Sequence, residues 1–245
     1  MDFDMKARFI WRALRARFRD QTTELKAIRK AVRPGDTVCD IGANKGSYLL
    51  WLARWVRPGR VIAFEPQEPL ARYLTEVCAR LRLNNITVEA KAVHSTTGQL
   101  TLHVPGSGDS PGASLSARVA TRETCRGVSV PVVSLDDYLK AEGRVSCLKV
   151  DVEGSELNVF KGAEVILRRH SPLLVFECEI RHLESGSVFD VFAFLTGLGY
   201  SGEFVCGRRL CPIAEFRPEV HQKQAGERFW DAKDYCNNFV FRKNS

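Results

Sequence analysis

DIGANKG, residues 40–46, forms a glycine turn directly after a short run of strand-forming residues, 37–41, which the chain enters through Pro34-Gly35. Residues 48–56 then continue as an apolar helix. A strand, a glycine turn and a helix in this order open a nucleotide-type α/β fold, in which the glycines let a ligand approach the backbone. The spacing is DxGxxxG and not GxGxxG, which favours a ligand without a pyrophosphate and argues against NAD.

Two later segments extend this pattern. A second strand is predicted over residues 60–64, and the carboxylate that follows it, Glu65, lies 25 residues after Asp40. An acid at this place can bind both hydroxyls of an adenosine ribose. Another predicted strand begins at Cys147 and ends in the sequence DVEGSE, residues 151–156, which carries three carboxylates.

These three blocks, in this order, resemble the FkbM family of S-adenosylmethionine-dependent methyltransferases. The likeness continues through residues 130–139, 161–163 and 175–177, and it covers residues 36–200. It implies an α/β fold: a single Rossmann-like class I methyltransferase domain, with a mostly parallel seven-stranded sheet, helices on both faces and an antiparallel C-terminal strand. We assign this domain to residues 34–245 and a basic, amphipathic helical arm to residues 1–33.

The donor site is expected around the glycine turn and the ends of the next strands. Asp40, Gly42 and Gly46 should hold the methionine end of S-adenosyl-L-methionine, and Glu65 should bind the ribose. Gly42 and Gly46 also satisfy turn geometry, and Lys45 is read as a solvated residue because no GK[ST] phosphate motif exists. The complete set predicted to bind the cofactor is Asp40, Gly42, Ala43, Asn44, Gly46, Glu65, Pro66, Lys91 and Ala92.

The acceptor side is predicted at the carboxyl edge of the sheet, where α/β folds bind ligands. Asp151 and Glu153 share a strand phase, and Glu177 ends the following strand. Asp151 is the candidate base for an acceptor hydroxyl, with Glu153 and Glu177 assisting and His182 as a second candidate base. The alternatives are that the same three carboxylates bind Mg²⁺, or that they bond to backbone and lysine, with Ser155 capping a helix.

The charge of the chain is unevenly placed. The net charge is +7 over 245 residues, but residues 1–30 hold nine Lys/Arg and four Asp/Glu, which leaves only +2 for the rest. A nucleic-acid enzyme usually spreads positive charge over its docking face, so a nucleic-acid partner is not expected. The Asn/Asp-Pro-Pro-aromatic motif of base-amino methyltransferases is also absent from the sequence.

The N-terminal arm repeats apolar residues at three- and four-residue spacing: Ala7, Ile10, Trp11, Leu14 and Phe18. We expect this stripe to pack against the domain and shield the cofactor pocket. The alternative is peripheral contact with a membrane, because arginines with Trp and Phe suit an anionic surface.

The compartment is inferred from the cysteines. Cys39, Cys147 and Cys178 lie in apolar runs, and no CxxC pair occurs among the eight cysteines. This pattern indicates reduced thiols and a cytoplasmic protein, with the inner face of the membrane as the site of any peripheral contact. No apolar run reaches the roughly 18 residues of a membrane span.

The middle of the chain contains an insertion. Residues 99–104 and 128–133 are predicted to form a strand pair, and the stretch 105–114 between them is rich in Gly, Ser and Pro. Such a loop is either a lid or acceptor loop, or an ordinary surface turn. The polar stretch 215–234 receives no assignment.

The predicted function is O-methylation of a hydroxyl on a sugar, glycolipid or glycosylated natural product, where the sugar preference is implied by the family resemblance alone. The acceptor is thus a small molecule or a glycan. The alternatives are an RNA methyltransferase and a non-catalytic peripheral-membrane scaffold that retains the fold. The sequence leaves the oligomeric state open.

Overall fold

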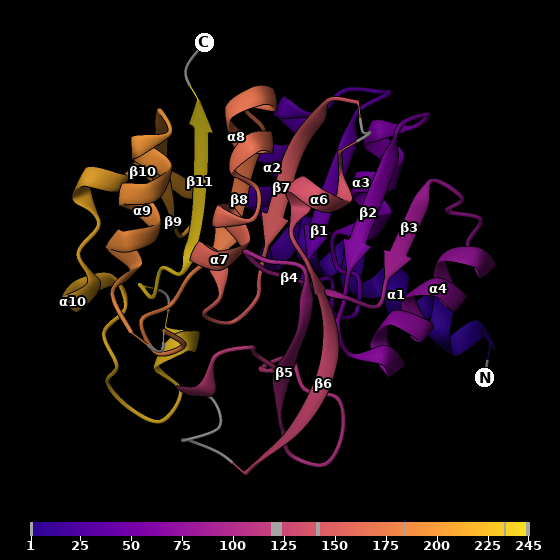
Figure 1. Cartoon of the computed structure of the whole chain (residues 1–245), viewed down its shortest axis with the longest axis horizontal. Helices are drawn as coiled ribbons and strands as arrows, with labels where there is room; N and C mark the ends of the chain where they lie inside the picture. Colours follow the sequence, from indigo (N-terminus) through magenta and orange to yellow (C-terminus); the bar gives the residue numbers. More distant parts are fainter. Residues whose placement is uncertain (1, 119–123, 141–142, 184, 233, 244–245) are drawn as a thin grey trace.

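The computed structural model describes residues 2–118, 124–140, 143–183, 185–232 and 234–243. Its main sheet contains the strands β1 (Thr37–Ile41), β2 (Arg60–Phe64), β3 (Ile86–Glu89), β7 (Val145–Val150), β8 (Leu173–Glu177), β9 (Tyr200–Cys206), β10 (Arg209–Pro212) and β11 (Asn238–Lys243). These eight strands lie in the order β10–β9–β11–β8–β7–β1–β2–β3 (Figure 1).

The predicted mostly parallel sheet with an antiparallel C-terminal strand is confirmed. Strands β3, β2, β1, β7 and β8 run parallel, and β11 is antiparallel to both β8 and β9. The predicted count of seven was wrong by one strand. The extra strand, β10, has only four residues and forms an edge hairpin with β9 through a turn at Gly207, and such a short strand leaves little periodic signal in the sequence.

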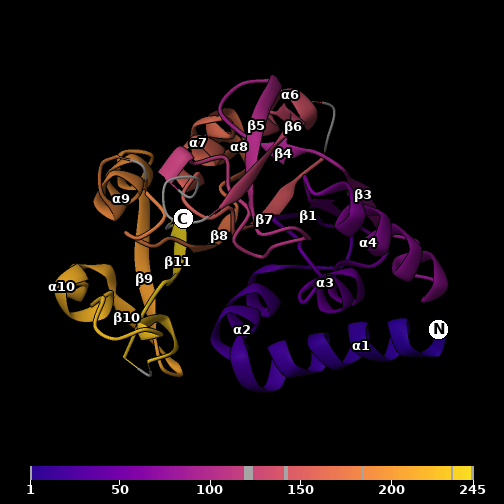
Figure 2. The ribbon, with the colours of Figure 1, turned by 90° about the horizontal axis from the view of Figure 1, so that it is seen from below.

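Helices cover both faces of the main sheet (Figure 2). One face carries α1 (Asp2–Arg15), the π-helical turn η1 (Ala16–Asp20), α2 (Thr22–Ala31), α3 (Leu49–Val56) and α4 (Glu68–Arg80). The other face carries α6 (Leu135–Tyr138), α7 (Glu156–Lys161), α8 (Glu164–His170) and α9 (Val188–Gly197), and the C-terminal region adds η2 (Ile213–Glu215), α10 (Pro218–His221) and η3 (Phe229–Asp231).

Each face of the sheet has its own hydrophobic core. All residues of β1 and β7 are buried, as expected for strands in the middle of a parallel sheet that is covered on both sides. Phe192 of α9 packs on Phe239, which stacks on Phe176, and the N-terminus of α9 is closed by a capping box between Ser187 and Asp190. The two cores fix the strand ends, and those ends carry the candidate site.

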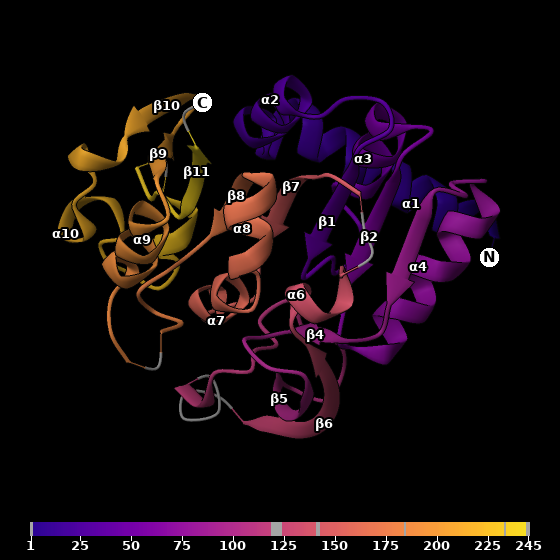
Figure 3. The same cartoon turned by 45° about the horizontal axis from the view of Figure 1, so that its top comes forward.

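The predicted inserted strand pair is confirmed and forms a second, smaller sheet. Strand β5 (Gly98–Pro105) pairs antiparallel with β6 (Cys125–Val133), and the short β4 (Ala92–Val93) pairs parallel with β6. Figures 1 and 3 show this sheet below the carboxyl ends of the parallel strands, on the same side as α6 and α7. It therefore holds the loop after β5 close to those strand ends.

The N-terminal segment is helical, but the residues that it buries are not those predicted. Phe9 and Ala13 are fully buried, and Trp51 of α3 donates its indole N–H to the Ala13 carbonyl at 2.7 Å. The stripe predicted to face inward is exposed instead: Ile10 is 36%, Trp11 57%, Leu14 42% and Phe18 66% exposed. One core cluster contains residues from both sides of position 33, so α1 and α2 pack as part of the fold.

No helix among the described residues is both long enough and apolar enough to cross a membrane.

A buried carboxyl in α2 leads to a prediction about pH and stability. Burial raises the pKa of Glu24 to about 7, from 4.5 for a solvated glutamate, so folding is penalised when this group ionises. The contribution of Glu24 to stability is present below pH 4.5 and is lost as the pH rises through about 7. We expect Glu24→Gln to stabilise the protein by about 2–3 kcal/mol at pH 8.

The measurement is urea unfolding of both proteins at pH 4.5 and at pH 8. The difference should vanish at the lower pH, and the exposed Glu227→Gln should change neither curve. An equal stabilisation by Glu24→Gln at both pH values would contradict this explanation.

Candidate active site

A cavity of about 110 Å³ lies where β1, β2 and β7 end, between those strands and the loop that follows β5. Its walls combine the glycine turn, the end of β2, the start of the small sheet and the first residues after β7. The lining residues are Ile41, Gly42, Asn44, Phe64, Glu65, Pro66, Gln67, Lys91, Ala92, Val93, Leu102, Pro111, Ala113, Ser114, Leu115, Asp151, Val152 and Glu153.

The glycine turn is pressed against the end of β7. Gly42 has a φ of +77°, and a Cβ atom at this position would lie 1.8 Å from the carbonyl oxygen of Asp151. The Asp151 N–H donates to the Ile41 carbonyl at 2.9 Å, and the Gly42 N–H donates to the Phe64 carbonyl at 2.9 Å. Three strand ends therefore meet at a distance that only glycine permits.

A buried lysine reinforces this junction. The Lys149 ammonium lies 3.4 Å from Oδ1 of Asp40 and 3.3 Å from Oδ2 of Asp151, and it donates to the Gly42 carbonyl at 3.3 Å. It also lies 5.2 Å from the centre of the Tyr48 ring. Burial alone would lower the pKa of Lys149, but Asp151 and Asp40 outweigh it and hold that pKa above its usual value, so the lysine stays charged.

Glu65 joins the turn to the end of β2. Its carboxylate accepts the Asn44 N–H at 2.7 Å and the Gln67 N–H at 2.9 Å, and the side chain is only 3% exposed. Burial raises the pKa of Glu65 to about 7, although these backbone hydrogen bonds oppose the shift. The group is thus a buried carboxyl on the cavity wall, where an acid was predicted.

Six of the nine residues predicted to bind the cofactor line the cavity, and three do not. Asp40 lies beneath the turn against Lys149, because its strand phase points it away from the cavity. Ala43 is buried in the core behind the turn. A Cβ on Gly46 would meet side-chain atoms of Phe9 and Leu74 at 2.6 and 2.9 Å, so this glycine makes room for α1 and α4.

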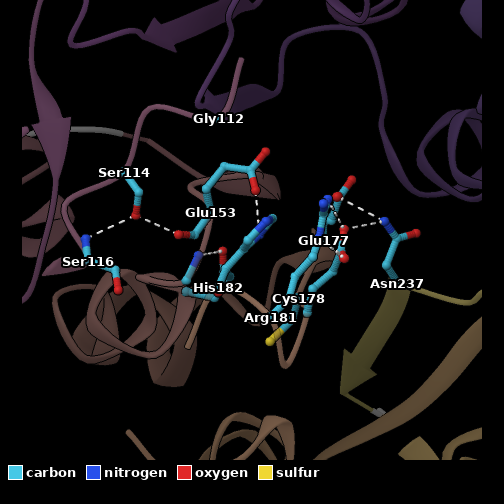
Figure 4. Close-up of polar contacts among 12 residues, drawn as sticks. Gly112, Ser114, Ser116, Glu153, Glu177, Cys178, Arg181, His182 and Asn237 are labelled. Carbon is cyan, nitrogen blue, oxygen red and sulfur yellow. Dashed lines mark hydrogen bonds and ion pairs between the residues drawn. The ribbon is translucent and has the colours of Figure 1, made fainter. Parts of the chain in front are cut away.

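The three predicted carboxylates of the acceptor side are brought together. One oxygen from each of Asp151, Glu153 and Glu177 lies within 4.8 Å of the others. They do not meet because Asp151 and Glu153 share a strand phase, as the sequence predicted. Strand β7 ends at Val150, and Glu153 follows in a left-handed turn with a φ of +55°. The Glu153 carboxylate points to Nδ1 of His182, with which it makes an ion-pair contact (Figure 4).

Glu177 lies behind Asp151 and Glu153, in a hydrogen-bonded group that the sequence did not predict. Asn237, next to β11, donates its side-chain amide to both Glu177 and Glu179 at 2.9 Å (Figure 4). Burial, with the charges of Asp151 and Glu153, raises the pKa of Glu177 well above its ordinary value.

Glu179 is the ionised member of this pair. Burial alone would raise the pKa of Glu179, but hydrogen bonds from Arg181, Glu177, Tyr235 and Asn237 lower it to about 2. Arg181 Nε and the Tyr235 hydroxyl donate to the same carboxylate oxygen at 2.5 and 2.6 Å. Tyr235 and Asn237 follow the polar stretch that received no assignment, which explains why the sequence did not reveal them.

The loop after β5 folds over the cavity. Gln67 and Ser110 exchange two hydrogen bonds, at 2.9 and 3.0 Å, and the Ser114 hydroxyl donates to the Glu153 carbonyl at 2.5 Å (Figure 4). Pro111, Ala113 and Ser114 are therefore walls of the cavity, which favours the lid interpretation of this loop over an ordinary surface turn. Gln67, which follows the Glu65-Pro66 pair, is a lining residue that the sequence analysis missed.

This fold and this site define a class: a Rossmann-like methyltransferase with its ligand cavity at the ends of β1 and β2. Residues 40–201 match the family described as the Methyltransferase FkbM domain. The match spans well over half of the chain, which therefore belongs to the FkbM family of S-adenosylmethionine-dependent methyltransferases. The comparison with curated proteins gave no match.

Solved structures share the fold at low identity. An FkbM methyltransferase from Methylobacillus flagellatus has a TM-score of 0.54 at 17% identity and covers 98% of this chain, which spans only 55% of that protein. A putative rRNA methylase from Clostridium thermocellum has a TM-score of 0.54 at 14% identity, with coverages of 92% and 96%. A putative methyltransferase from Streptococcus mutans, solved in complex with SAH, has a TM-score of 0.52 at 10% identity, with coverages of 92% and 98%.

The residues around the cavity fit the chemistry of S-adenosylmethionine. Glu65 offers a carboxylate for a ribose diol, and Phe64, Val93 and Leu102 offer apolar walls for a base. The absence of a Cβ on Gly42 leaves the turn backbone open to a ligand. The cavity volume of about 110 Å³ is smaller than the roughly 300–1,000 Å³ of most ligand pockets.

The buried lysine leads to a prediction about stability. Lys149→Met would leave the carboxylates of Asp40 and Asp151 without their counter-charge, at a cost of about 3–5 kcal/mol in the free energy of unfolding. Urea unfolding at pH 7 measures this change. Lys45→Met, four residues beyond Ile41 and exposed, is the matched control and should stay within about 0.5 kcal/mol. Equal effects of the two substitutions would show that Lys149 does not hold the strand ends.

Proposed function

We propose that this protein binds S-adenosylmethionine in the cavity and transfers its methyl group to a hydroxyl of a sugar, glycolipid or glycosylated natural product. The observation that carries the proposal is the meeting of two chemistries at one cavity. A glycine turn and a buried carboxyl, Gly42 and Glu65, form one wall, and Asp151 and Glu153 form another.

The donor would lie along the first wall. The backbone at Gly42 and Asn44 would hold its methionine end, and Glu65 would accept hydrogen bonds from its ribose hydroxyls. Pro66, Lys91 and Ala92 would border the adenine. When bound, the donor supplies an electrophilic methyl group on a positively charged sulfur. The cluster of carboxylates beside the cavity favours such a charge.

The acceptor chemistry would fall to Asp151. This carboxylate lines the cavity and is positioned by Lys149 at 3.3 Å, so it can accept the proton of an acceptor hydroxyl and leave that oxygen nucleophilic. Glu153, with His182 as its partner, would orient the acceptor from the neighbouring position. Alignment and exclusion of water by the loop over the cavity complete what the protein contributes.

Mg²⁺ is the alternative to this proton-transfer network. The three carboxylates are close enough to share an ion. Each already has a partner in the protein, however: Lys149 for Asp151, His182 for Glu153 and Asn237 for Glu177. The raised pKa of Glu177 also disfavours metal binding, since a ligand must give up its proton. We therefore assign no step to a metal.

Two other functions compete with this proposal. The likeness to a putative rRNA methylase favours RNA as a second candidate acceptor. A non-catalytic scaffold would not need to bind the donor at all. The decisive experiment incubates the protein and S-adenosylmethionine with panels of sugars, cell-envelope extracts and RNA, and searches by mass spectrometry for a product heavier by one CH₂. A product in the RNA panel alone would replace the carbohydrate assignment.

Gly42 provides a test of the donor site. Gly42→Ala would drive a methyl group into the Asp151 carbonyl and displace one wall of the cavity, so the affinity for S-adenosylmethionine should fall at least about tenfold. Calorimetric titration measures the affinity. Gly35→Ala is the matched control, because Gly35 also has a positive φ, +94°, with nothing within 4 Å of its Cβ position. An unchanged affinity in Gly42→Ala would place the donor elsewhere.

Asp151 provides a test of the chemistry. Asp151→Asn keeps the shape of the side chain but cannot accept a proton, so turnover should fall by about 10²–10⁴-fold while the affinity for S-adenosylmethionine changes little. Asp4→Asn, an exposed residue at the start of α1, serves as the control. Full activity of Asp151→Asn would remove this residue from the mechanism and leave donor binding untouched.

A further inference from the structure

The surface of α1 that faces away from the sheet is apolar, although α1 already buries another apolar side. Along α1 and the η1 turn that continues it, Phe9, Ala13 and Ala16 are buried against the fold, while Trp11, Leu14 and Phe18 are 57%, 42% and 66% exposed, and Ile10 is 36% exposed. Figure 2 shows α1 as the outermost element on its side of the sheet. A helix with two apolar sides leaves one of them for a partner outside the fold.

Arginines surround these exposed side chains and stack on aromatic rings. Phe18 lies against Trp51 of α3, which lies against Trp55, with ring centres 6.1 Å apart in both pairs. The guanidinium groups of Arg15, Arg17, Arg29 and Arg54 lie over these rings or over Trp11, at 5.2–5.9 Å. We name this surface the arginine–aromatic face: Ile10, Trp11, Leu14, Arg15, Arg17, Phe18, Arg29, Trp51, Arg54 and Trp55.

The arginines of this face retain charge for a partner. Arg15 pairs with Asp20, but within the described part of the chain Arg17, Arg29 and Arg54 contact rings and no carboxylate at ion-pair distance. Positive charge continues along the same side of the sheet beyond α2. A groove of about 530 Å³ there is lined by Lys26, Lys30, Arg144, Arg208, Arg242 and Lys243, among other residues.

We propose that the arginine–aromatic face docks this protein on the surface of an anionic membrane. Trp, Phe, Leu and Ile would enter the boundary between headgroups and acyl chains, and the arginines would meet the lipid phosphates. Trp and Tyr with flanking Arg are the side chains that favour this depth, because each combines an apolar body with a polar end. The proposal goes beyond the methyl-transfer function and does not depend on it.

The composition of the face favours a membrane over its two competitors. A nucleic acid would use the arginines and stack on the aromatic rings, but it gives Ile10 and Leu14 no apolar partner. A second copy of the chain would bring the same arginines together, and like charges at one interface oppose association. An anionic lipid surface satisfies the aliphatic side chains and the charges at once.

The test is co-flotation of the full chain with vesicles of phosphatidylcholine alone, or mixed with phosphatidylglycerol in about a 3:1 ratio. We expect recovery with the anionic vesicles, and this recovery should decrease with added salt, which screens the arginines. Trp11→Ser combined with Leu14→Ser should lower the partition coefficient about tenfold or more. Truncation of α1 is not a suitable variant, because it would remove Phe9 and Ala13 from the core.

The matched control is Val165→Ser combined with Val220→Ser, two exposed aliphatic residues outside the face, at 61% and 55% exposure. It should float like the original protein, and both double variants should keep their thermal unfolding midpoint. The proposal is overturned if the original protein stays at the bottom of the gradient or if the Trp11/Leu14 variant floats as well. Two further results would overturn it if the original protein does not bind vesicles. One is that the original protein is a dimer in analytical ultracentrifugation and the Trp11/Leu14 substitutions dissociate it, and the other is that the original protein binds RNA and these substitutions abolish the binding.

Discussion

The position of the Lys149 ammonium is the constraint on which the site depends. It lies between the carboxylates of Asp40 and Asp151 and reaches the carbonyl of Gly42, so it ties together the end of β1, the glycine turn and the end of β7. Backbone hydrogen bonds and the missing Cβ of Gly42 bring the same segments together. The charge and the steric fit act at one place, and together they hold the strand ends that form the cavity wall.

The carboxylates around this junction differ in character because their surroundings differ. Asp151 lies beside an ammonium at the cavity, Glu65 is buried with backbone N–H groups as partners, and Glu177 is buried among other acids. Burial raises the pKa of Glu65 to about 7, whereas Arg181 and its neighbours hold that of Glu179 near 2. A site that separates its acids in this way can combine an ionised base with neutral hydrogen-bonding groups.

The N-terminal segment links the core of the protein to its surface. Phe9 packs where Gly46 has no side chain, so the helix next to the glycine turn and α1 stabilise one another. The outer side of α1 and η1 carries Trp11, Leu14 and Phe18 with arginines around them. The same amphipathic repeat that indicates a helix in the sequence thus serves two surfaces, and periodicity alone does not tell which of them is buried.

The architecture could be predicted from the amino-acid sequence. The strand–turn–helix at residues 37–56, the apolar runs of β7 and β8, and the inserted pair β5 and β6 were recognisable because their signals are local. The sequence also predicted part of the cavity lining: Gly42, Asn44, Glu65 and Asp151 follow predicted strands, and the carboxyl ends of parallel strands meet at one edge. The family match over residues 40–201 agrees with the same segments.

Which side chains face the cavity, and which partners they have, depends on contacts between distant parts of the folded chain. Asp40 points to Lys149 and not to the cavity, and Glu153 reaches its place through a left-handed turn. Asn237 and Tyr235 come to Glu179 from a distant, weakly patterned part of the chain, and Gln67 meets Ser110 across a loop. Most of these contacts join residues that lie tens to more than a hundred positions apart in the sequence, and the position of Glu153 depends on the backbone conformation of a single residue. Neither a long-range contact nor a single backbone dihedral leaves a periodic pattern in the sequence.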